Sequence, residues 1–122
     1  MTQEENLLLK DLCSRLPYGV IVKTPKGDGY LNEVSLTIFG HELGVNIEDT
    51  KRTHFKLDEC RPYLRSLDSI TDEEQNELDY LRFRHDEEGW LEFILSRHLD
   101  WRGLISKDLA LEAPKGMYES FD

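Results

Sequence analysis

The stretch that decides the fold class is YGVIVKTPKGDGYLNEVSLTIFG, residues 18–40. It begins with a short β-rich segment and continues through PKGDG at 25–29, where Pro25 fixes its own φ and two glycines supply positive φ at little cost. From Tyr30 to Ile38, apolar residues alternate with Glu, Ser and Thr. The pattern predicts a β-hairpin with one buried and one solvent-facing side.

Helical patterns flank this hairpin on both sides. In residues 2–16, leucines recur at four-residue spacing, and Pro17 ends the predicted helix because the residue before a proline avoids the α region. The sequence TDEE at 71–74 is a capping box, so a second helix is expected to begin there and to end near the basic residues of 82–85. A third helix is expected to begin at Asp86.

Three further segments complete the predicted fold. THFKL at 53–57 alternates and predicts a strand, the polar segment 41–52 reads as a connection, and 60–67 is extended because it contains Pro62. LALEAP at 109–114 predicts a short strand or an extended tail. We therefore predict an α+β fold in a single small domain, residues 1–122. It has an N-terminal helix, a three- or four-stranded antiparallel sheet, and two helices after residue 70.

The charge of the chain narrows the classes of partner. Its 122 residues can enclose one hydrophobic core, with 39% hydrophobic and 33% charged residues and a net charge of −10. Because no basic stripe is present, direct nucleic-acid binding is disfavoured. The acidic excess favours solubility, and it could also face a basic partner or imitate DNA.

The cysteines, histidines and apolar runs indicate the compartment. Cys13 and Cys60 form no C-x-x-C motif and the four histidines are scattered, so we expect reduced thiols, no bound metal and no cofactor. The N-terminus lacks the basic start and apolar core of a signal peptide, and no apolar run approaches the ~20 residues of a membrane span. We expect a cytoplasmic protein with no membrane contact.

The segment HLDWRGLISKDLALEAP, residues 98–114, contains the weak catalytic candidates His98, Asp100 and Arg102. A histidine and a carboxylate could act as a general base and its orienting group, or as two metal ligands. Residues two apart point to opposite sides of a helix, however, and no third ligand or nucleophile is marked. The structural alternative places His98 at a helix end, where a protonated or hydrogen-bonded imidazole is favoured, with Asp100 and Arg102 pairing locally or capping the next turn.

Other charged residues also have a structural and a functional interpretation. Arg61, Tyr63 and Arg65 share one face of an extended segment, which could bind an anionic group; we favour pairing of the two arginines with nearby acids. The acidic run from Asp68 to Asp79 lacks the spacing of a calcium loop and predicts a solvated helix face. After Gly103 a short turn is expected, with Asp108 in the left-handed position that follows it.

Two blocks carry a family resemblance. RPYLRSLDSITDEEQNEL (61–78) and HLDWRGLISKDLALEAPKGMY (98–118) resemble a family of small acidic proteins from gut Bacteroides genomes and their phages or prophages. The family pattern runs like K-P-Y-L-R-P-L-S-S-M-T-E-E-E and then H-x-D-[YF]-R-G-L-I-x-x-G-L-A-L-x-A-P-x-x-M-Y. The chain departs from it mildly at Arg61, Ser66, Ile70, Trp101 and Asp108. The resemblance implies a phage or mobile-element origin, and it supplies no activity, cofactor or catalytic residue.

Three functions follow from these features as hypotheses. The leading one is a non-enzymatic accessory protein, related to phages or mobile elements, that binds another protein of host or phage. The first alternative is a small enzyme that uses His98, Asp100 and Arg102. The second is an acidic DNA mimic or anti-defence protein, which requires the carboxylates of 68–79 and 86–92 to line one face.

Overall fold

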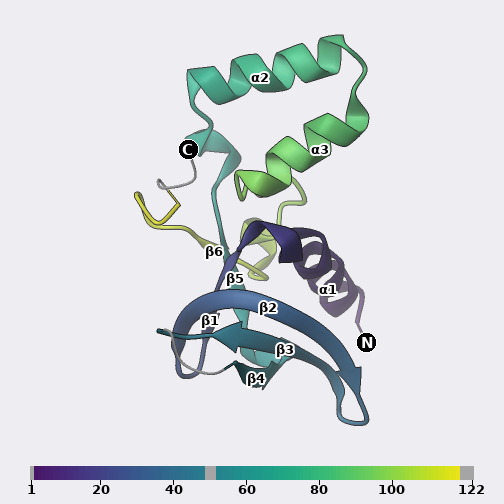
Figure 1. Cartoon of the computed structure of the whole chain (residues 1–122), viewed down its shortest axis with the longest axis vertical. Helices are drawn as coiled ribbons and strands as arrows, with labels where there is room; N and C mark the ends of the chain where they lie inside the picture. Colours follow the sequence, from purple (N-terminus) through teal and green to yellow (C-terminus); the bar gives the residue numbers. More distant parts are fainter. Residues whose placement is uncertain (1, 49–51, 119–122) are drawn as a thin grey trace.

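The computed structural model describes residues 2–48 and 52–118. Within these ranges, six strands form one curved sheet in the order β4-β3-β2-β1-β5-β6 (Figure 1). The strands are β1 (Ile21–Thr24), β2 (Gly27–Thr37), β3 (Gly40–Asn46), β4 (Thr53–Lys56), β5 (Arg61–Leu64) and β6 (Leu111–Glu112). The helices are α1 (Gln3–Arg15), α2 (Asp72–Phe83) and α3 (Glu87–Ser96), with short 3₁₀ turns η1 (Leu16–Tyr18), η2 (Leu57–Glu59), η3 (Leu67–Ser69) and η4 (Ile105–Lys107). The predicted class, a single small α+β domain with an N-terminal helix and two helices after residue 70, is confirmed.

The sheet is larger than predicted, and it is mixed rather than antiparallel. The described residues form six strands instead of three or four, and β6 runs parallel to β5, with Tyr63 opposite Leu111. The segment 41–52, predicted as a connection, supplies most of β3, where Leu43 and Val45 are completely buried. The polar residues around this pair hide its alternation. β6 lies within the predicted short strand or extended tail of 109–114, but its parallel pairing has no local signal, because its partner β5 lies far away in the sequence.

The predicted hairpin is confirmed as β1 and β2, although its turn is tighter than expected. β2 already begins at Gly27, so Pro25 and Lys26 alone form the turn. Gly27 has a φ of +129°, as the turn requires, whereas Gly29 meets a different constraint. A Cβ atom on Gly29 would collide with the backbone carbonyl oxygen of Asn46, so this glycine permits the close approach of β2 and β3.

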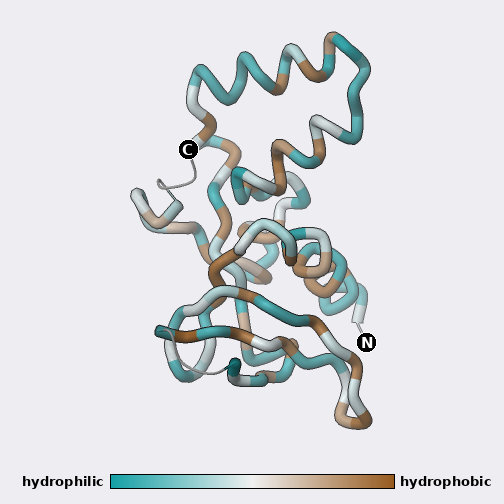
Figure 2. Tube along the Cα trace, in the orientation of Figure 1, coloured by the Kyte–Doolittle hydropathy of each residue, from teal (hydrophilic) through white to brown (hydrophobic). Residues whose placement is uncertain are grey.

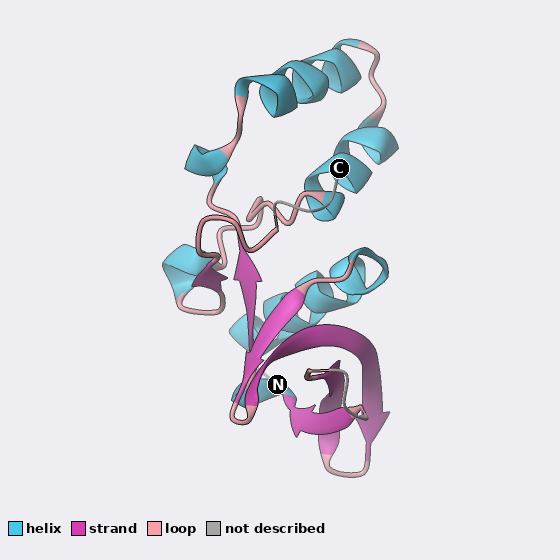
Figure 3. Ribbon diagram, turned by 60° about the vertical axis from the view of Figure 1, so that its left-hand side comes forward, coloured by secondary structure: helices cyan, strands magenta, loops and turns pink. Residues whose placement is uncertain are grey.

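The main core lies between α1 and the sheet (Figures 1 and 3). Thr2 caps α1, because its hydroxyl accepts a hydrogen bond from the Glu5 N–H at 3.1 Å. Leu8 and Leu12 then point from the helix into the core, where both are buried. The buried residues that join them are Val20, Val22, Leu31, Leu43, Val45, Phe55, Leu57, Cys60, Leu64, Leu104, Leu109 and Ala110.

The helices α2 and α3 form an antiparallel pair that projects away from the sheet (Figures 1 and 3). The predicted capping box is confirmed: Thr71 accepts from the Glu74 N–H at 3.2 Å, and Glu74 accepts from the Thr71 N–H at 3.0 Å. The helix predicted to begin at Asp86 is α3, and Asp86 caps it by accepting from the Gly89 N–H. The pair has its own small core of Leu78, Ile94 and Leu99, with Ile70, Trp90 and Phe93 against it.

The length and polarity of the helices bear on membrane insertion. None of the helices in the described ranges is long and apolar enough to cross a membrane.

Candidate functional site

His98 lies just beyond the end of α3, in the left-handed conformation with a φ of +59°. The side chain is buried, and its ring stacks on that of Tyr118 with the centroids 3.9 Å apart. Burial, together with the positive charges of Arg15 and Arg65, lowers the pKa of His98 to about 4. The imidazole is therefore neutral near pH 7. Of the two forms expected at this helix end, protonated or hydrogen-bonded, the protonated one is not favoured, because desolvation outweighs the field of the helix end.

Tyr118 attaches the C-terminal tail to the sheet. Its hydroxyl accepts a hydrogen bond from the Ile21 N–H at 2.8 Å and donates one to the Tyr63 carbonyl at 2.7 Å. Burial raises the pKa of this phenol, so it stays protonated and able to donate. Tyr118 thus joins β1 and β5 on one side to the end of α3 through its stacking on His98.

Asp100 caps the turn that follows it. Its Oδ1 accepts from the Leu104 N–H at 2.7 Å and its Oδ2 from the Ile105 N–H at 3.0 Å, so both carboxylate oxygens hold the start of η4. The turn ends at Asp108, which has a left-handed φ of +59° as predicted. The structural interpretation of Asp100 as a cap is confirmed.

Arg102 points toward α1. Its Nη1 donates to Asp11 Oδ1 at 2.8 Å and to Ser14 Oγ at 3.1 Å. Asp11 also accepts from Arg15 Nε at 2.8 Å, and Arg15 Nη2 donates to the Leu99 carbonyl at 2.7 Å. Arg15 and Asp11 are completely buried. The expectation that Arg102 pairs locally is therefore wrong. Arg102 instead pairs with Asp11 on α1, because a completely buried carboxylate is stable only when positive charges compensate it.

The candidates His98, Asp100 and Arg102 thus have three different sets of partners. The ring of His98 packs on Tyr118, Asp100 holds the backbone of η4, and Arg102 bonds to α1. These contacts join α1, α3 and the tail into one block. The geometry is that of a folded junction, as the structural alternative describes.

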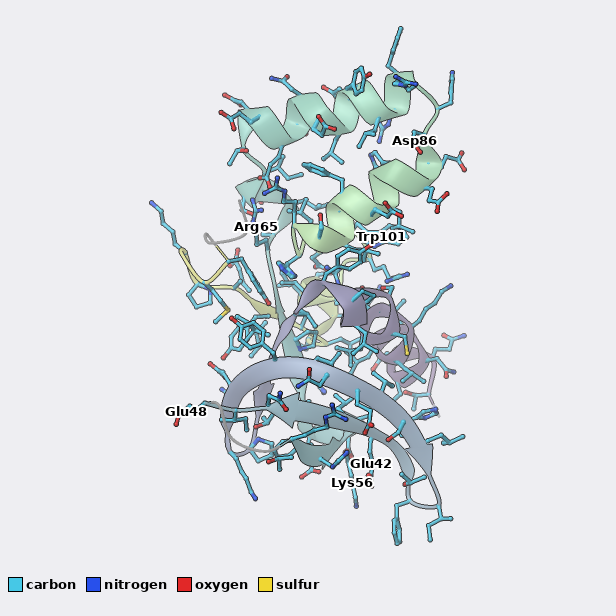
Figure 4. The ribbon with its side chains drawn as sticks, viewed as in Figure 1. Glu42, Glu48, Lys56, Arg65, Asp86 and Trp101 are labelled. Carbon is cyan, nitrogen blue, oxygen red and sulfur yellow. The ribbon has the colours of Figure 1, made fainter. Side chains whose placement is uncertain are left out.

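Arg65 connects the sheet to α2 (Figure 4). Its two Nη atoms donate to the two carboxylate oxygens of Glu74 at 2.8 and 2.7 Å, a bidentate pair that is largely buried. The hydrogen bonds from Arg65 lower the pKa of Glu74 to about 2. The Arg65 backbone also bridges the segment after α3, because its N–H donates to the His98 carbonyl and its carbonyl accepts from the Asp100 N–H. The predicted pairing of Arg65 with an acid is confirmed.

Arg61 and Tyr63 also bond within the chain. Arg61 Nε donates to the Asp108 carbonyl at 3.1 Å and its Nη1 to the Cys60 carbonyl at 2.8 Å, so Arg61 holds backbone oxygens instead of the predicted acid. The Tyr63 hydroxyl donates to Asp28 Oδ1 at 3.1 Å. Arg61, Tyr63 and Arg65 are therefore separately engaged within the chain.

Sequence reasoning missed several residues of this junction. Asp11 and Arg15 are four residues apart on α1, beside its buried leucines. An oppositely charged pair on the apolar face of a helix was the signal in the sequence that could have indicated a buried ion pair. Glu74 was predicted to lie on the solvated face of the helix with the other acids, but it is buried and pairs with Arg65. The remaining acids of that run are exposed as predicted: Asp68, Asp72, Glu73, Glu77 and Asp79.

A cavity of about 1200 Å³ lies beside Arg65, between the start of α2, the end of α3 and residues 112–116. Its wall carries both signs of charge, with Glu73, Glu77 and Arg97 among the lining residues. In the ranges 2–48 and 52–118, no group of three His, Cys, Asp or Glu side chains could hold a metal ion. Cys13 and Cys60 are both free thiols.

The most exposed large apolar side chains of the described residues lie at two places far apart in the fold. At the turn between β2 and β3, Leu36, Ile38 and Phe39 are 73%, 93% and 75% exposed. At the end of α2, Phe83 is 83% exposed and Tyr80 is 51% exposed. Side chains of this size are normally covered in a folded chain, so these two places are candidates for contact with another molecule.

Comparisons with known proteins give this chain no relative. No protein-family model matches it, and neither the search of curated proteins nor the search of solved structures gave a match.

Proposed function

We propose that the protein is a non-enzymatic accessory protein, of phage or mobile-element origin, that acts in the cytoplasm by binding another protein of host or phage. The observation that supports this proposal is the exposure of Ile38 and Phe39 at one end of the molecule and of Phe83 at the other. The chain as a whole is charged, with 33% charged residues and a net charge of −10. Exposed apolar side chains on such a surface are typical of protein-binding sites.

The two alternatives receive less support. An enzyme that uses His98, Asp100 and Arg102 would need their polar atoms to face one substrate, whereas Asp100 and Arg102 bond to their own chain. A DNA mimic would need a row of free carboxylates along α2 and α3. Glu74 is withdrawn from such a row by its pairing with Arg65.

The test is capture from a lysate of the bacterial host, with the tagged full-length chain as bait. We expect the same protein to be recovered in repeated captures and to bind the purified chain at a fixed stoichiometry in isothermal titration calorimetry. The control bait is the same chain kept unfolded in urea, which exposes the same apolar residues without the folded surface. Repeated captures in which the folded and unfolded baits recover the same proteins would contradict the proposal.

A further inference from the structure

Two separate hydrophobic cores divide the structure. The main core has fourteen buried residues, whereas the second has only Leu78, Ile94 and Leu99. In the part of the chain that the structure describes, the two clusters share no residue. Leu78 and Ile94 belong to α2 and α3, which project from the sheet as an antiparallel pair (Figures 1 and 3). Residues 70–96, here called the helical arm, therefore lie outside the core that stabilises the rest of the chain.

Cavities interrupt the packing between the helical arm and the rest of the chain. The cavity of about 1200 Å³ lies between the two ends of the arm and residues 112–116. A second cavity, of about 320 Å³, lies between Tyr18 of η1 and residues of α2 and α3, among them Phe93. Where α3 passes α1, Trp90 meets Trp101 edge-on, with the ring centroids 6.3 Å apart. The sides of the arm are therefore only partly packed against the body of the protein.

A single guanidinium group binds both ends of the helical arm. Arg65, directly after β5, donates from its two Nη atoms to the Glu74 carboxylate at the start of α2, at 2.8 and 2.7 Å. Its Nη1 also donates to the Arg97 carbonyl, just after α3, at 3.4 Å, and its Nε and Nη2 bond to Ser69, which precedes the arm. The side chains of Arg65 and Glu74 are only 14% and 9% exposed, so solvent screens this ion pair weakly. Arg65 therefore ties the arm to the sheet.

The two helices of the arm have little stability of their own. α2 has 12 residues and α3 has 10, and isolated helices shorter than about 12–15 residues are marginal in water. Each helix also carries two glutamates four residues apart, Glu73 with Glu77 and Glu88 with Glu92, whose like charges repel. Figure 2 shows α2 mainly in teal, the colour of hydrophilic residues. Both helices therefore depend on their attachment to Arg65, and loss of this attachment unfolds them together.

We propose that the helical arm unfolds and refolds as one unit while α1 and the sheet stay folded, and that the ion pair of Arg65 and Glu74 is the latch that keeps the arm closed. Proteins open locally in cooperative units, and units with few buried contacts open most easily. The open state exposes Leu78, Ile94 and Phe93 beside a folded sheet. Any molecule that binds these side chains shifts the population toward the open state. The inference does not rest on the proposed function.

The first experiment measures the opening of each segment in the wild type. Hydrogen exchange of the full chain, followed by NMR at urea concentrations below the unfolding transition, gives an opening free energy for each slowly exchanging amide. We expect the amides of α2 and α3 to share one value, lower than that of the amides of β2 and β3. This value should also decrease less steeply with urea, because opening of the arm exposes less surface than unfolding of the whole chain.

A substitution in the main core tests whether the arm opens separately. Val45→Ala removes buried methyl groups from β3, so the amides of β2 and β3 should exchange roughly tenfold faster. The amides of α2 and α3 should exchange at the wild-type rate, because β3 stays folded when the arm opens. If Val45→Ala does not fold, the urea dependence of the wild type answers the same question without a variant.

A substitution at the start of α2 tests the latch. Glu74→Gln removes the charge that pairs with Arg65 and keeps a residue that can complete the capping box. We expect the amides of α2 and α3 to exchange about 30-fold faster or more in this variant. Glu77→Gln is the matched control, because it removes an exposed charge from the same helix, and it should change these rates by less than about threefold.

Three results would overturn the inference. If Val45→Ala accelerates the amides of the arm as much as those of the sheet, the arm unfolds only with the whole chain. Different opening free energies in α2 and α3 would show that the two helices do not open as one unit. Equal exchange rates in Glu74→Gln and Glu77→Gln would show that the ion pair is not the latch. Each of these results leaves the proposed function standing, because none of them involves a partner protein.

Discussion

The buried histidine should make the protein lose stability in mildly acidic solution. The pKa of His98 is about 4 in the folded chain and 6.5 when the residue is exposed. Between these pH values the unfolded chain binds a proton that the folded chain does not, so the free energy of unfolding decreases as the pH falls. A shift of this size corresponds to about 2.5 kcal/mol lost between pH 7 and pH 4.5. The loss is attributable to the burial of the ring and to the nearby charges of Arg15 and Arg65.

Two variants isolate this contribution. His98→Asn removes the titrating ring and keeps a residue that tolerates the left-handed conformation; we expect it to be less stable at pH 7 and to lose about 2.5 kcal/mol less than the wild type on acidification. His85→Asn is the matched control, because His85 is exposed and also left-handed, with a φ of +57°. Urea unfolding at several pH values, followed by circular dichroism, gives the free energies. Parallel pH curves for the wild type and His98→Asn would refute the reasoning.

Three further substitutions test individual contacts by urea unfolding. Glu74→Gln should lower the free energy of unfolding by about 2–3 kcal/mol at pH 7, because it leaves Arg65 half-paired. This difference should vanish as the pH falls from 4.5 to 2, because the low pKa of Glu74 stabilises the wild type only above this range. An unchanged difference at pH 2 would contradict the pairing. Gly29→Ala should cost about 1–3 kcal/mol because its Cβ meets the Asn46 carbonyl, and no loss would show that β3 moves away freely. Asp100→Ala should cost about 2–4 kcal/mol because two N–H groups lose their acceptor, with Asp100→Asn losing less.

Elements whose determinants lie close together in the sequence were predicted well. The capping box of Thr71 and Glu74 acts over three residues, and the left-handed Asp108 follows a turn of one 3₁₀ helix. The hairpin of β1 and β2 needs only a turn and alternating residues on each side of it. In all three cases the controlling interactions are local, so the pattern of residues indicates the structure directly.

The strand β3, which depends on distant partners, was missed, and so were the pairings that complete the sheet. β3 was read as a connection because glycine and polar residues surround Leu43 and Val45, and only its pairing with β2 and β4 places these two in the core. β6 lies in the segment 109–114, predicted as a short strand or an extended tail, and only its parallel pairing with β5 decided between the two. A sheet of three or four strands therefore became one of six.

The candidate site shows the same division. The sequence by itself identified His98, Asp100 and Arg102 as the residues whose role was open, and it determined that Asp100 can cap the next turn. Only the tertiary structure decided that Arg102 bonds to Asp11, because the two lie on elements at opposite ends of the chain. It also decided that His98 is neutral, since its pKa depends on how completely other segments exclude water from the ring. Local hydrogen bonds are encoded within a few residues, whereas burial and long-range pairing arise only when the whole chain has packed.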